Sequence, residues 1–507
     1  MPTAASWTEV RRATRDVAHL VAFRTSAVRR PRAFAAVAGI FVGCTVAAAG
    51  VPAFLEGAGS YGGYSLDALT ILPSAMAGFM LLAIASAVAS GGGRELLNRE
   101  HGVAFAVSPT TDHLGALLLA PLNIAWLLQA WVLLGATSYG VQRTFLPFAL
   151  VGVVLWIVLA TAIGQVLAWS IEAIRRRTYG IAIVRSMAVA LFGAAALLQL
   201  AGRLGTLLDA FPTTELAGGL VNGFNGRWGF SVGLELLLIA VAVALGAIPA
   251  HVAARRAPRD ELRVESGTYP ARRLPRSPLA ALVRTDRGSV WRAVPMRRGL
   301  AVLAIGPGVV ALAGNLDWSQ MTILPGLVAS GGALLFGVNA WCLDARGGLW
   351  RESLPVGPGA VFGARAWVLA EFLLAASFVT IVLAGLRAGL PNPSELTALI
   401  CTWVVVVLQV VSSAMRWSSR RPFAVDLRSA RATPAPPLVM VGYSTKLAVT
   451  TTLTSLIFSG LARTPHPEVS ILVASPFVVW SLVRLLHARD SWTDPVQRAN
   501  VVTTVAG

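Results

Sequence analysis

The residues with the most obvious chemistry lie together in one short stretch, LNREHGVAFAVSPTTDHLGALLLAPL, between two long apolar runs. This stretch, residues 97–122, holds titratable side chains beside helix-interrupting residues: Arg99, Glu100, His101, Gly102, Pro109, Asp112 and His113. Carboxylates and imidazoles can bind a metal ion or transfer protons. No metal-ligand spacing joins the two histidines and Asp112, so we expect neither a metal nor a cofactor here. The pattern instead predicts a charged, solvated connection between two helices.

Two other residue types that often carry chemistry form no catalytic pattern. Cys44, Cys342 and Cys401 lie in or beside apolar runs, where thiols mostly act as small hydrophobic groups, and their spacing matches no metal or disulfide pattern. A phosphate-binding loop needs Gly-Lys followed by Ser or Thr. The chain has one lysine, Lys446 in YSTKLAV, and so has no such loop. We therefore predict a protein without an ATPase site of its own.

The elements that position these residues are long apolar helices. Of 507 residues, 55% are hydrophobic and only 13% are charged, whereas soluble proteins carry about 25% charged residues. Apolar runs of about 20 residues are long enough to cross a hydrocarbon core. We predict an all-α polytopic membrane protein without a cleavable signal peptide. Its twelve expected spans are 33–55, 67–90, 114–135, 145–171, 181–202, 229–252, 299–316, 321–343, 361–385, 396–415, 438–461 and 468–487.

The distribution of basic residues predicts the orientation. With both termini in the cytoplasm, 36 of the 42 lysine and arginine residues lie on the cytoplasmic side and five in outer loops. This asymmetry is what the positive-inside rule requires. The net charge of +18 is thus a topology signal that requires no nucleic-acid partner, although the basic loops should contact anionic lipid headgroups.

The sequence divides into two similar halves. Residues 1–253 and 298–507 each hold six predicted spans, and 254–297 is a cytoplasmic linker rich in Arg and Pro. LTILP at 69–73 corresponds to MTILP at 321–325, and other short matches follow in the same order. Six spans return the chain to the same side, so the two six-helix repeats are predicted to be parallel. Apolar residues interleaved with arginines ahead of the first and seventh spans predict an interfacial amphipathic helix before each half, the second within the linker.

The loops after the second span of each half form a matching pair. GGRELLNRE at 92–100 corresponds to GGLWRES at 347–353, and VSP at 107–109 corresponds to VGP at 356–358. An amphipathic cytoplasmic loop repeated at equivalent points favours a docking role, because a two-fold partner needs the same surface twice.

This loop resembles a feature of the permeases of type-2 ATP-binding-cassette exporters. Those permeases carry, after the second span, an E-x-G element, a short helix and a small-Pro pair. Glu100-His101-Gly102 and Ser108-Pro109 match this pattern. Glu352 and Pro355 match it loosely in the second half, which lacks the Gly after its Glu. In architecture the whole chain is similar to the fused, two-half actinobacterial permeases that export antibiotics and other compounds.

The resemblance implies a partner and a set of docking residues. It implies a separate ATPase subunit in two copies, export of a small amphipathic or lipid-like compound, and a place in the bacterial cytoplasmic membrane. It assigns ATPase docking to six residues of the two loops: Arg99, Glu100, His101, Gly102, Arg351 and Glu352. Arg99 and Glu100 are expected to lie in a solvent-facing loop, so Arg99→Glu with Glu100→Lys should uncouple transport without unfolding the protein. The matching change, Arg351→Glu with Glu352→Lys, should weaken ATPase association too.

Two alternative functions are compatible with part of the sequence. A proton-coupled transporter of the major-facilitator type would share twelve spans and parallel halves, and it would need carboxylates within the membrane. Glu371 is the deepest such residue and a candidate for lining the transport path, while Glu235 lies near the outer end of its span. A membrane-embedded enzyme acting on lipid-linked substrates would need clustered acidic or histidine residues at one membrane face, and the outer loops hold only isolated ones.

Overall fold

The structure is a computed structural model that describes residues 7–26, 31–89, 107–120, 124–203, 206–207, 210–256, 275–313, 316–424 and 434–507. Over these residues the protein is 83% helical and contains no strand, which confirms the predicted all-α class. The contacts divide the chain into two compact units, Met1–Thr268 and Tyr269–Gly507. The boundary falls within the predicted 254–297 linker.

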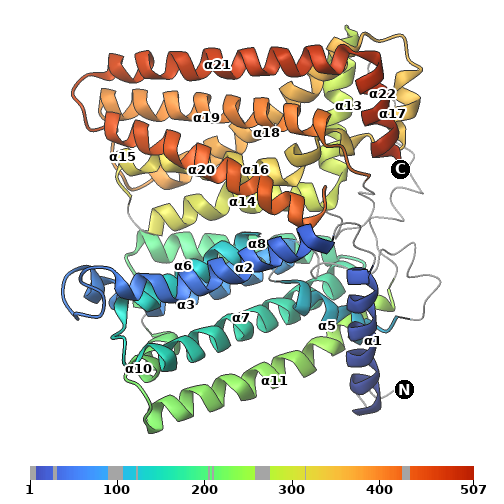
Figure 1. Ribbon diagram of the computed structural model, residues 1–507. Coiled ribbons are helices and arrows are strands. Elements are labelled where there is room, and N and C mark those ends of the chain that lie inside the picture. The colour runs from blue at the N-terminus through green and yellow to red at the C-terminus, as the bar shows by residue number, and fades with distance from the viewer. Residues whose placement is uncertain are drawn as a thin grey trace. The chain divides into compact units, whose positions relative to one another are not determined.

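The first unit contains helices of very different lengths (Figure 1). In chain order they are α1 (Trp7–Ser26), α2 (Pro31–Gly50), the 3-10 turn η1 (Val51–Phe54), α3 (Tyr64–Ala89), α5 (Pro109–Leu119), α6 (Ile124–Gly140), α7 (Leu146–Arg175), α8 (Gly180–Leu200), α10 (Thr213–Val221) and α11 (Gly226–Ala254). Its core lies where α3, α6, α7 and α10 meet, around Trp156, whose indole donates a hydrogen bond of 2.9 Å to the Met76 carbonyl.

The second unit is also entirely helical in its described part. Its elements are α13 (Pro278–Arg292), α14 (Val294–Ala313), α15 (Trp318–Met321), α16 (Ile323–Leu335), the 3-10 segment η3 (Gly337–Leu343), α17 (Gly347–Glu352), α18 (Pro358–Gly385), α19 (Pro393–Arg420), α20 (Pro437–Leu461), α21 (Pro467–Thr493) and α22 (Pro495–Ala506). Many of these helices begin at proline, which fits the first helical turn because the amide that it lacks would have no partner there. In both units the small-Pro pair noted in the sequence begins a helix, at Ser108-Pro109 and at Gly357-Pro358.

Six described helices are long and apolar enough to cross a membrane, namely α3, α7, α11, α18, α19 and α21. The number rises to eight if two bent helix pairs each count as one span. A polytopic membrane protein is therefore the class that the fold supports. Each of the twelve predicted ranges does contain helix, but the remaining ones are shorter or interrupted, so twelve spans and the repeat stay predictions.

Two predicted spans do not correspond to a single described helix. The range 114–135 is shared by α5 and α6, with residues 121–123 outside the described part. In the range 321–343, the helix bends by 41° and Asn339 leaves the helical conformation. The Asn339 amide donates to the carbonyls of Phe423 and Pro434 at 2.8 and 3.0 Å, so it caps backbone that would otherwise be unpaired.

Both predicted interfacial segments are helices that lie across the ends of longer ones (Figure 1). The axis of α13 makes an angle of 83° with that of the following helix, α14. In the first unit, Glu9 of α1 accepts a hydrogen bond of 2.8 Å from Thr110 of α5 and lies 3.0 Å from His251 of α11. In the second unit, Asp286 of α13 lies 2.8 Å from Arg365 of α18. Each amphipathic helix is thus joined to its own unit by an acidic side chain.

The directions of the long helices agree with alternating crossings. Near the start of both helices, the Trp228 indole of α11 donates a hydrogen bond to the Phe148 carbonyl of α7. Near the end of both, Arg256, just after α11, donates to the Ala173 carbonyl of α7. The helices α7 and α11 therefore run in the same direction, as two spans separated by one other span must.

Candidate functional site

The first predicted docking loop lies outside the described residues. This applies to Arg99, Glu100, His101 and Gly102, and the described chain resumes at residue 107. At that point the Ser108 hydroxyl accepts a hydrogen bond of 3.1 Å from the Thr111 amide and caps α5. The docking role of this loop stays a prediction.

The second predicted docking loop is described, and its two charged residues differ in environment. Glu352, at the end of α17, is exposed and pairs with Arg498 of α22 at 2.8 Å. Arg351 points inward, with its side chain 11% exposed, and lies 2.9 Å from Asp286 and 2.8 Å from Asp344. Arg351 is therefore turned away from solvent, because two carboxylates hold its guanidinium within the unit.

Arg351 belongs to a network of four charged residues, which we call the arginine–aspartate network. Its centre is Arg365 of α18, fully buried, with Nε 2.8 Å from Asp286 and Nη2 2.9 Å from Asp344. Arg365 also donates to the Ala340 carbonyl. Two arginines thus meet two aspartates, and the network joins α13, the end of η3, α17 and α18.

The network carries no net charge when all four groups are ionised, and an aromatic side chain lies against its central arginine. Burial opposes ionisation of Asp286, yet the guanidinium groups of Arg365 and Arg351 hold the pKa of that carboxyl below its usual value. The Arg365 guanidinium lies 5.4 Å from the centre of the Trp341 ring, and Trp341 stacks on Trp492 at 3.6 Å. The Trp492 indole in turn donates to the carbonyl of Pro358, at the start of α18.

The exposed face of α17 carries apolar side chains, whereas Arg351 points inward to the arginine–aspartate network. Leu349 and Trp350 are 52% and 69% exposed, on adjacent positions of this six-residue helix. Aromatic side chains are the residues that most often anchor protein interfaces. The loop therefore presents an apolar pair to its surroundings while the network fixes it from behind.

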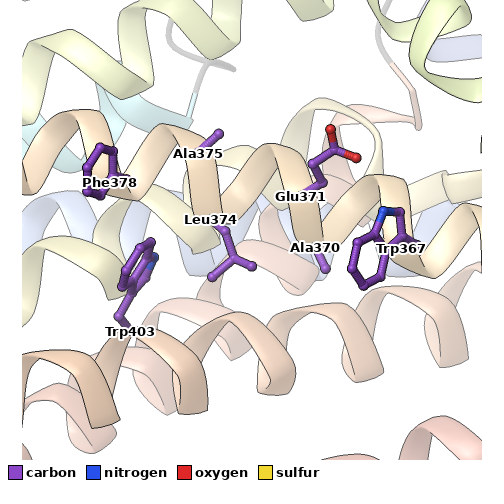
Figure 2. Close-up of a pocket in the computed structure, with 7 residues that line it drawn as sticks. All are labelled: Trp367, Ala370, Glu371, Leu374, Ala375, Phe378 and Trp403. Atoms are coloured by element: carbon purple, nitrogen blue, oxygen red, sulfur yellow. The ribbon is translucent and has the colours of Figure 1, made fainter. Parts of the chain in front are cut away.

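Glu371 of α18 lines a hollow of about 360 Å³ together with Trp367, Ala370, Leu374, Ala375, Phe378 and Trp403. Figure 2 shows its carboxylate directed away from the side of α18 that carries Leu374 and faces Trp403. The carboxylate lies 2.7 Å from Arg287 of α13. Glu371 is therefore paired with the amphipathic helix, and its predicted role in lining a path is not tested by this arrangement.

Glu235 of α11 is the most isolated carboxyl group of the described chain. It is fully buried, and neither carboxyl oxygen has a hydrogen-bond partner among the described residues. The neighbouring core of the first unit is formed by apolar side chains such as Trp156 and Leu220. The neutral acid is the form that such surroundings tolerate, because a buried, unpaired carboxylate is very costly.

Sequence reasoning missed the arginine–aspartate network, although one signal was present. Arg365 lies only a few residues inside an apolar run, and an ionisable residue inside a span is by default a functional or structural candidate. The partners of Arg365, Asp286 and Asp344, lie 79 and 21 residues earlier, so their proximity depends on tertiary structure.

No known protein family, curated protein or solved structure matches this chain.

Proposed function

We propose that this chain is the permease subunit of an ATP-binding-cassette exporter. It would move a small amphipathic compound outward with energy from ATP hydrolysed by a separate subunit. The class of protein rests on the six to eight apolar helices of membrane-crossing length. The assignment within that class rests on the second docking loop and on the resemblance of its first-half counterpart to the exporter permeases.

The observation that carries the proposal is the attachment of α17 to a long apolar helix. An exporter must transmit a movement at its ATPase to its spans, which requires an exposed docking surface fixed firmly to a span. Leu349 and Trp350 provide the exposed surface, while Arg351, their neighbour in the chain, is bound through Asp286 and Asp344 to Arg365 of α18. A displacement of α17 would thus reach α13 and α18 together.

The site that binds and hydrolyses ATP must then lie on another polypeptide. The only lysine of the chain, Lys446, lies in the middle of α20 and in no glycine-rich loop. The purified chain is expected neither to bind nor to hydrolyse ATP, and export from vesicles should require both a co-expressed ATPase and ATP. The measurement is ATPase activity and substrate export with and without that subunit. Export driven by a proton gradient without nucleotide would contradict the proposal.

The proposed orientation has its own test. Reporter fusions at Gly267, in the linker, and after Gly507 are expected to be active as a fluorescent protein and inactive as a periplasmic phosphatase. The reason is that eleven arginines between residues 254 and 297 oppose translocation of the linker. An active phosphatase at one site but not the other would mean an odd number of crossings between them, and would overturn the map.

Glu235 favours a second candidate, a proton-coupled transporter. A buried carboxyl group that is neutral in one state and ionised in another can carry a proton across a membrane. The Glu235→Gln variant separates the two candidates, since it keeps the side-chain volume and removes the titratable proton. Under the exporter proposal ATP-driven export should change less than two-fold, whereas under the proton-coupled alternative transport should be abolished.

A further inference from the structure

A second hollow, of about 430 Å³, lies between the C-terminal parts of α19 and α21. Four basic side chains line it, Arg416 and Arg420 from α19 and Arg484 and His487 from α21. We call it the arginine cavity. It lies within the second unit and uses no residue of the docking loop or of the arginine–aspartate network.

The positive charge of the arginine cavity has no counter-charge in the described chain. None of its three arginines forms an ion pair with a described residue, and Nε of Arg484 is buried without a hydrogen-bond partner. Lys446 of α20 is close enough for its charge to interact with those of Arg484 and Arg416. The contrast with Arg365 and Arg351, which are matched by aspartates, indicates that an external anion completes this site.

The chemistry of the lining favours a phosphate group. Arginine presents a planar set of donors that binds phosphate through two parallel hydrogen bonds, and three such groups line one hollow. The Nδ1 atom of His487 lies 2.9 Å from the Val483 carbonyl, which leaves Nε2 for a ligand. The volume is within the range of sites that hold small ligands.

The surroundings indicate that this phosphate belongs to a lipid. Only 17% of the apolar window of α21 is buried, compared with 61% for α19. Val479, Trp480 and Leu486 of α21 are 59%, 64% and 55% exposed, so an apolar surface continues from the cavity along the helix. Acyl chains can cover this surface while the headgroup enters the cavity, and basic pockets between apolar helices are known to hold anionic headgroups.

We propose that the arginine cavity of α19 and α21 binds the phosphate group of an anionic phospholipid. The full-length protein in phosphatidylcholine nanodiscs provides the test, with phosphatidylglycerol of matched acyl chains as the probe and native mass spectrometry as the measurement. The Arg416→Gln/Arg484→Gln variant should bind phosphatidylglycerol roughly 30-fold more weakly, since each basic residue near an anionic lipid contributes about a five-fold effect.

Two further variants keep the experiment decisive. Arg420 is exposed, so Arg420→Gln should fold normally and still weaken binding about five-fold. Arg489→Gln removes the same charge from α21, but its guanidinium lies against Gly359 of α18, so binding should be unchanged.

Three outcomes would overturn the lipid assignment. Equal affinity of the double variant and the wild type would leave the arginines as topology signals alone. Equal loss in Arg489→Gln would show a general effect of charge. Full displacement of phosphatidylglycerol by millimolar inorganic phosphate would identify a soluble phosphate compound as the ligand. Preferential binding of phosphatidylglycerol, dependent on the cavity arginines and resistant to phosphate, is the expected result.

Discussion

Replacing Arg365 by methionine is expected to lower the free energy of unfolding of the second unit by about 3–5 kcal/mol. The methionine fills a similar volume but cannot pair with a carboxylate. The buried Asp286 and the largely buried Asp344 would then share Arg351 as their one remaining cationic partner in the network. Hydrogen exchange of the α13 and α18 amides is the measurement, because it reports the second unit separately. A loss of 3 kcal/mol corresponds to exchange that is roughly 150-fold faster.

The control and the pH dependence follow from the same network. Arg346 is exposed beside the network, and Arg346→Met should change stability by no more than about 0.5 kcal/mol. Because the folded-state pKa of Asp286 lies below its unfolded value of about 3.9, the stabilisation is complete above that pH and is lost as the pH falls through the folded-state pKa. The difference between wild type and Arg365→Met should therefore shrink in acid. A difference that is independent of pH would mean that packing, rather than ion pairing, was lost.

Truncating Leu349 and Trp350 to alanine together is expected to weaken binding of the ATPase subunit by at least about 30-fold and to abolish export. Each side chain is more than half exposed, and a buried tryptophan anchor at an interface typically contributes 2 kcal/mol or more. Neither side chain supports the core of the unit, so expression and thermal unfolding should remain close to those of the wild type. Co-purification of the ATPase with the permease is the measurement.

A tryptophan and a leucine away from the docking loop serve as a control for the loss of exposed apolar area: Trp367 on α18 and Leu390 in the loop after it. Trp367 is 61% exposed and Leu390 is 97% exposed, and neither lies on the docking loop. The Trp367→Ala/Leu390→Ala variant should retain the ATPase fully. If the Leu349→Ala/Trp350→Ala variant also retains the ATPase and exports at the wild-type level, α17 is not a docking element.

Charge reversal in the second loop is expected to affect folding as well as docking. Arg351→Glu would place a third carboxylate beside Asp286 and Asp344, so the second unit should lose stability as well as any docking. Glu352 remains suited to the original experiment because it is exposed and its pair with Arg498 lies at the surface.

The sequence by itself determined the helical class, the approximate positions of the helices and the two amphipathic segments. These features depend on local patterns: apolar runs of membrane length, prolines at helix starts, and arginines interleaved with apolar residues. Their consequences reach only a few residues along the chain. For this reason α7, α18 and α19 coincide closely with the predicted ranges.

Tertiary structure decided which charged residues are partners. Arg351 and Glu352 are adjacent in the sequence and look alike there, but one lies against two aspartates while the other lies at the surface. Glu371 pairs with a residue 84 positions earlier, and the arginine cavity forms only because α19 and α21 pack together. The free energy of a charge depends on burial and on neighbours within a few ångströms, and those neighbours come from distant parts of the chain.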